Sequence, residues 1–147
     1  MSHVRIVPVR ALLLLVPAAL ALPACTTDLG PTPAELKVRW EAQNVLPQNY
    51  RTDLIAYLRT YLNNPEGVRS ASVSAPMLKP VGPGERYVVC VRYNARDMLG
   101  KYAGVKDGAA IYVSAKLERF VDRPLAVKEL CKDAAFAPFP ELEAVKR

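Results

Sequence analysis

Residues 86–96 read Arg-Tyr-Val-Val-Cys-Val-Arg-Tyr-Asn-Ala-Arg and carry the strongest strand pattern in the chain. Polar and apolar side chains alternate here, which predicts a β-strand, because successive side chains of a strand point to opposite faces of a sheet. One face is apolar along its whole length and consists of Tyr87, Val89, Val91, Tyr93 and Ala95. The other face is apolar only at its centre and consists of Arg86, Val88, Cys90, Arg92, Asn94 and Arg96. The first face is therefore suited to a core, and the second needs only a partial cover.

Weaker strand patterns lie on both sides of this stretch. Residues 68–75 predict a strand, and residues 76–84, which contain three prolines, predict a loop. A glycine-rich loop over 97–108 leads to strands over 109–113 and 117–121, which are joined by a tight turn. We therefore expect an antiparallel meander of three or four strands.

Two helices are expected before the sheet. The sequence Thr-Pro-Ala-Glu at 32–35 has the form of a capping box, and it begins a helix over 33–43. Leu36 and Trp40 are four residues apart in this helix, so both are expected to face the core. A second helix over 50–63 has an apolar stripe at helical spacing, formed by Leu54, Ile55, Leu58, Tyr61 and Leu62.

The C-terminal part predicts a helical turn or short helix over 124–132, followed by an extended tail with prolines. With helices first and an antiparallel sheet after them, the expected fold class is α+β. In this class the N-terminal helices pack on a small antiparallel sheet of three or four strands.

The N-terminus carries an export signal. An apolar run over 11–25 follows a positively charged flank and is shorter than the about 20 residues of a membrane-spanning helix. Residues 22–25, Leu-Pro-Ala-Cys, resemble the lipobox of bacterial lipoproteins. This resemblance covers the leader alone, and it implies that the mature chain begins at a lipid-bearing Cys25. Two alternatives are cleavage by ordinary signal peptidase after Ala-Leu-Ala at 19–21 and a retained membrane anchor.

The leader sets the expected organisation and location of the protein. Residues 1–24 form the signal peptide, 25–33 a short tether with two prolines, and 34–147 a single domain. An extended tether of about 3 Å per residue holds the domain close to the bilayer. We expect the protein in the cell envelope, anchored through an acyl chain such as palmitate on Cys25. In a Gram-negative cell this location is the outer membrane, facing the periplasm.

Cys90 and Cys131 are the two cysteines left if Cys25 carries lipid. Disulfides persist in exported proteins, so we expect these two residues to be bonded. Closing a loop of about 42 residues would stabilise the fold by up to about 4 kcal/mol. The bond would also draw the C-terminal segment over the centre of the second face of residues 86–96. The alternative is a pair of separate buried thiols.

The side chains that most enzymes need are missing from the mature chain. The one histidine is His3, in the leader, so no imidazole remains as a base or a metal ligand. No phosphate-binding glycine motif and no CxxC pair is present, and neither a metal nor a cofactor is expected. Catalysis by a carboxylate pair is one alternative, with candidates Glu85, Asp97, Asp107 and Glu118. A Ser-Lys dyad is another, from Ser72 or Ser114 with Lys79 or Lys116.

A basic group on and after the strong strand is the candidate surface for an anionic partner: Arg86, Arg92, Arg96 and Lys101. Guanidinium forks match phosphate and carboxylate groups, and tyrosines lie between these cations in the sequence. The alternative is a solvated strand rim with ion pairs to Glu85 and Asp97. The net charge of +6 is spread without a run of like charge, and together with export it argues against nucleic acid as a partner.

These features favour a membrane-anchored cell-envelope lipoprotein that acts as an interaction or assembly module without enzymatic activity. Its expected partners are the membrane, through Cys25, and an envelope protein or an anionic polymer. The alternative function is a carboxylate-dependent cell-wall or glycolipid hydrolase.

Overall fold

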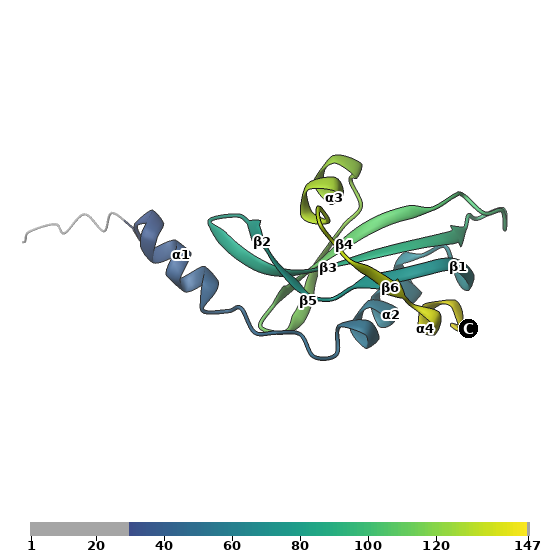
Figure 1. The fold of residues 1–147 in the computed structure, drawn as a ribbon, viewed down its shortest axis with the longest axis horizontal. Coiled ribbons are helices and arrows are strands. Elements are labelled where there is room, and N and C mark those ends of the chain that lie inside the picture. Colours follow the sequence, from purple (N-terminus) through teal and green to yellow (C-terminus); the bar gives the residue numbers. More distant parts are fainter. Residues whose placement is uncertain (1–29, 147) are drawn as a thin grey trace, which may run out of the picture. The chain divides into compact units, whose positions relative to one another are not determined.

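The computed structural model describes residues 30–146, and one antiparallel sheet dominates it (Figure 1). The order across the sheet is β5-β4-β3-β1-β6, and β2 also pairs with β3. The strands are β1 (Asn64–Ser74), β2 (Met77–Val81), β3 (Gly84–Arg96), β4 (Lys106–Val113), β5 (Lys116–Val121) and β6 (Phe136–Pro138). The helices are α1 (Pro33–Glu41), α2 (Tyr50–Tyr61), α3 (Pro124–Leu130) and α4 (Pro140–Glu143).

The predicted fold class is wrong in its proportions and in its packing. The sheet has six strands, and the helices are few and short instead of forming an N-terminal layer on a small sheet. Two strands account for the difference. β2 forms in the proline-containing segment expected to be a loop, where Pro80 pairs with Glu85 at an edge of the sheet that tolerates proline. β6 adds to β1 through Phe136–Pro138.

Helix α1 begins at the predicted capping box, with the Thr32 side chain and the Glu35 carboxylate each accepting from the other's backbone N–H. The helix buries none of its residues, and Leu36 is 43% exposed, so the expectation that it faces the core is wrong. Trp40 is half-buried instead against the hairpin between β2 and β3. A Cβ atom at Gly82 would lie 3.0 Å from its ring, so the missing side chain there makes room for the indole.

The main core lies between α2 and the apolar face of β3. Leu54 and Leu58 of α2 are fully buried, as the apolar stripe predicted. They belong to one cluster with Val89, Val91 and Tyr93 of β3. The alternation seen in the sequence thus places this face of the strand in the core.

The second face of β3 is covered at its centre by the C-terminal part of the chain. The predicted disulfide between Cys90 and Cys131 is present, with an S–S distance of 2.02 Å and a Cα–Cα distance of 5.8 Å. Cys90 is fully buried in a smaller cluster with Val88 and Ile111, against which Leu130 and Phe136 pack. Figure 1 shows α3 on the side of the sheet opposite α2. We call this side the α3 face.

Strand β5 covers only part of β4. The two strands pair from Ala109 to Val113 of β4, because the chain leaves the sheet after Val121 and enters α3. The first part of β4, residues 106–108, pairs with β3 on one side. Within residues 30–146 it has no strand on the other side. We call residues 106–108 the open half of β4.

Candidate functional site: a groove beside the open half of β4

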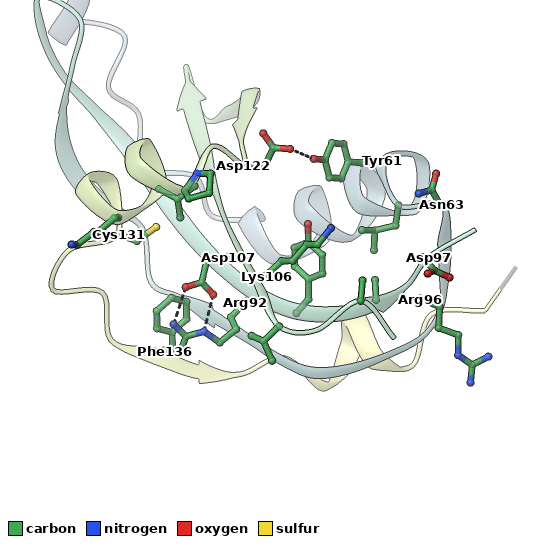
Figure 2. Close-up of a pocket in the computed structure, with 18 residues that line it drawn as sticks. Tyr61, Asn63, Arg92, Arg96, Asp97, Lys106, Asp107, Asp122, Cys131 and Phe136 are labelled. Carbon is green, nitrogen blue, oxygen red and sulfur yellow. Dashed lines mark hydrogen bonds and ion pairs between the residues drawn. The ribbon is translucent and has the colours of Figure 1, made fainter. Parts of the chain in front are cut away.

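A groove of about 1230 Å³ lies beside the open half of β4 (Figure 2). The end of α2 lines one wall through Tyr61, Leu62 and Asn63. The opposite wall comes from the start of α3 and the segment after it, and its residues are Pro124, Val127, Lys128, Cys131 and Phe136. The floor is formed by β3 and the start of β4. The groove therefore continues the line of β5 past the point where that strand ends.

An ion pair crosses the floor on the α3 face. Arg92 donates from Nε to Asp107 Oδ1 at 2.7 Å and from a terminal nitrogen to Asp107 Oδ2 at 2.9 Å. The hydrogen bonds to Asp107 raise the pKa of the Arg92 guanidinium, so Arg92 stays charged. The same guanidinium lies 4.6 Å from the ring centre of Phe136. Arg92 is thus fixed from two sides and serves the structure of the floor.

A second polar contact fixes the wall formed by α2. The Tyr61 hydroxyl donates to Asp122 Oδ2 at 2.5 Å, and this bond raises the pKa of Tyr61 far above its ordinary value. The ring of Tyr61 also packs against Tyr57 and Phe120, with ring centres 5.5 and 5.1 Å away. The contact ties the end of α2 to the residues that follow β5.

The four predicted basic residues do not form one surface. Arg86 is 2% exposed, stacks 3.9 Å above the ring of Trp40, and donates to the Trp40 carbonyl and, at 2.8 Å, to Gln43 Oε1. It lies near the opposite end of β3 from Arg96, roughly 30 Å away at the rise of a strand. Arg92 is paired in the groove, and Lys101 is exposed in the connection after β3.

Arg96 lies at the far end of the groove from the ion pair (Figure 2). Its guanidinium lies 5.1 Å from the ring centre of Tyr102, and that of Arg69 lies 4.2 Å from the same centre. Sequence analysis missed Arg69 because its strand has an irregular pattern, with positive φ angles at Gly67 and Ser70. A bulged strand breaks the alternation that would have revealed the face.

The candidate catalytic carboxylates are dispersed or already engaged. Glu85 and Glu118 are exposed, on β3 and β5 respectively. Asp97 and Asp107 both line the groove. Asp107 binds Arg92, and Asp97 accepts from the backbone N–H groups of Leu99 and Lys101 at 2.8 and 2.9 Å. Asp97 thus orders the turn after β3.

The candidate Ser-Lys dyads are placed on several elements. Ser72 lies in β1, Ser114 in the turn after β4, and Lys116 at the start of β5. Lys79 donates to the Lys132 carbonyl at 2.6 Å.

Residues 30–146 contain no group of three side chains suited to hold a metal ion. No helix among them has the length and apolarity needed to cross a membrane. The predicted lipid site, Cys25, lies outside the described residues.

Comparisons of the chain with protein-family models, with curated proteins and with solved structures found no match.

Proposed function

We propose that this chain is a lipid-anchored cell-envelope protein whose folded domain binds another envelope protein and catalyses no reaction. The observation that carries the proposal is the groove beside the open half of β4. The lipobox-like residues 22–25 support export and anchoring. The bond between Cys90 and Cys131 is compatible with an oxidising compartment.

An open strand edge favours binding of a polypeptide. Backbone N–H and C=O groups along such an edge are free to pair with an extended segment of another protein. The walls at Tyr61 and Val127 stand on either side of this edge and would flank such a segment. At its floor Arg92 and Asp107 are paired with each other, which suits a binding surface better than a reacting centre.

Photo-crosslinking in cells tests the groove directly. A photoreactive amino acid replacing Val105, which is 57% exposed and lines the groove, should give one discrete adduct with an envelope protein. The matched control position is Lys116, an exposed residue at the start of β5, away from the open half of β4. Lys128→Trp, which places an indole in the groove, should abolish the adduct. An identical adduct from both positions, or one that survives Lys128→Trp, would remove the groove from the proposal.

The alternative of a hydrolase is tested with Asp107→Asn. A binding function predicts that this variant, at normal abundance, keeps most of its ability to complement a deletion strain under envelope stress. Complete loss of complementation, with the adduct at position 105 preserved, would favour catalysis by a carboxylate.

The anchor is tested separately. Radiolabelled fatty acid should enter the wild-type protein and should not enter Cys25→Ala. In a Gram-negative host the labelled protein should fractionate with the outer membrane. Equal labelling of the variant would refute lipidation at this cysteine without bearing on the groove.

A further inference from the structure

A cluster of two arginines and one tyrosine lies at the end of the α3 face. Arg69 and Arg96 both stack on the ring of Tyr102, at 4.2 and 5.1 Å from its centre. The Tyr102 hydroxyl donates to the Gly67 carbonyl at 2.8 Å, which ties the ring to β1. We call Arg69, Arg96 and Tyr102 the arginine cluster. One aromatic ring thereby contacts both guanidinium groups.

Neither Arg69 nor Arg96 takes part in the ion pairs found among residues 30–146. The ion pairs among residues 30–146 use other cations, namely Lys37, Arg51 and Arg92. The buried Nε of Arg96 makes no hydrogen bond within this part of the chain. Asp97, directly after Arg96, accepts through Oδ1 from the backbone N–H groups of Leu99 and Lys101. An external anion would therefore supply a negative partner for these guanidinium groups.

An apolar tip lies next to the arginine cluster in the same connection between β3 and β4. Met98 and Leu99 are 85% and 81% exposed, although the turn that carries them is ordered by Asp97. Lys101 follows them and is also exposed. The protein thus presents two large apolar side chains to solvent, between Asp97 and Gly100, and the basic residues Arg96 and Lys101 lie one position further out on each side.

The arginine cluster and the apolar tip together indicate the chemical class of the ligand. Guanidinium groups bind phosphate through paired hydrogen bonds, and basic residues are attracted to anionic leaflets. Exposed Met and Leu side chains enter the boundary between headgroups and acyl chains. A free phosphate ion would neutralise the arginines but would leave both apolar side chains in water. We propose that the arginine cluster and the apolar tip together bind the phosphate headgroups of an anionic bilayer.

This binding site goes beyond the function proposed above, although Arg96 also lines the far end of the groove. It uses neither Cys25 nor the open half of β4. The vesicle experiment below and the crosslinking experiment can therefore fail independently.

The test places an environment-sensitive fluorophore at the tip of the whole protein. Met98→Cys, purified from its own membranes and labelled with nitrobenzoxadiazole, is mixed with vesicles of phosphatidylcholine alone or with added phosphatidylglycerol. Only the anionic vesicles should shift the emission to the blue and allow quenching by a lipid-bound quencher. Because the probe reports the position of the tip, the result does not depend on whether an N-terminal lipid holds the protein to the vesicle.

Charge variants identify the cations responsible. Arg69→Gln with Arg96→Gln should lower the ratio of bound to unbound tip about 25-fold, since each basic residue near an anionic surface contributes roughly a fivefold factor. The matched control is Lys116→Gln with Arg119→Gln, which removes the same charge from exposed positions on β5. The control should change the ratio much less. Equal losses in the two double variants would overturn the proposal.

Two further arms complete the test. Leu99→Ser keeps the arginines and should weaken the blue shift, whereas Leu125→Ser on α3, where the leucine is 82% exposed, should leave it unchanged. Inorganic phosphate without vesicles should cause no shift. A blue shift with phosphate alone, or an equal shift with neutral vesicles, would contradict binding to an anionic bilayer. Retention of the shift in Leu99→Ser would exclude the apolar tip from the contact.

Discussion

Gly108 makes room for an aromatic ring, and adding one methyl group there should destabilise the domain. A Cβ atom at this position would lie 2.2 Å from Cζ and 2.8 Å from Cε1 of Phe120. Carbon atoms in contact are about 3.5–4.0 Å apart, so the ring would have to withdraw by more than 1 Å. Tyr57 and Tyr61 pack against the same ring, with centres 5.2 and 5.1 Å away, and they restrict this movement.

The expected size of the effect follows from two opposing terms. Overpacking a core costs about 1–3 kcal/mol. Gly108 does not have a positive φ, so alanine fits the backbone and recovers about 0.4–1 kcal/mol by restricting the unfolded chain. Gly108→Ala should therefore lower the free energy of unfolding by about 1–2 kcal/mol. In urea, this corresponds to a midpoint lower by about 1 M.

A double-mutant cycle separates the ring from other causes. In a Phe120→Ala background the added methyl group meets no ring, so Gly108→Ala should be neutral or slightly stabilising there. The coupling between the two positions should exceed 1 kcal/mol. A loss below 0.5 kcal/mol in the wild-type background, or the same loss in both backgrounds, would refute the steric explanation.

Three further changes test other parts of the structure. Replacing Cys90 and Cys131 by alanine should lower the free energy of unfolding by about 4 kcal/mol, since the bond closes a separation of 41 residues; an unchanged urea midpoint would contradict this. Arg86→Met should cost about 1–3 kcal/mol and shift the emission of Trp40, the one tryptophan, whereas Lys116→Met should do neither. Burial, with a smaller effect from nearby Asp122, raises the pKa of Tyr93 to about 12 from 10. Since this pKa is raised in the folded state, stability should be full below pH 10 and fall between pH 10 and about 12, as followed by tyrosinate absorbance and circular dichroism. Ionisation of Tyr93 at its ordinary pKa would show that the ring is not buried.

The parts of the fold that could be predicted are those where local pattern and tertiary environment agree. The alternation over 86–96 matches a strand buried on one whole face and at the centre of the other. The stripe on α2 matches Leu54 and Leu58 in the core. The disulfide followed from the number of cysteines and the expected compartment, and it needed no information about geometry.

The size of the sheet could not be predicted from these patterns. β2 contains Pro80, which signals a loop, but an edge strand needs hydrogen bonds on one side alone. β6 is three residues long, too short to show an alternation. Ser114 and Ala115 both have positive φ angles in the turn between β4 and β5. Glycine and asparagine favour this conformation, so a serine and an alanine give no sequence signal for it.

The sequence predicted which face of β3 carries the basic residues, but it did not predict the surroundings of each one. Alternation places Arg86, Arg92 and Arg96 on one face of β3, and the structure keeps this parity. The alternation does not determine which residues approach each arginine from distant parts of the chain. Trp40 covers Arg86, whereas Tyr102 supports Arg96 and brings it next to Arg69.

The groove and the disulfide depend on the same stretch of chain. β5 ends at Val121 because Pro124 begins α3, and the bond from Cys131 to Cys90 holds the end of that helix against the centre of β3. Cys131 itself lines the groove. The disulfide therefore maintains one wall of the groove as well as the stability of the domain. The proposed binding site, if built in this way, needs an oxidising compartment to keep its shape, which agrees with the export signal predicted from the sequence.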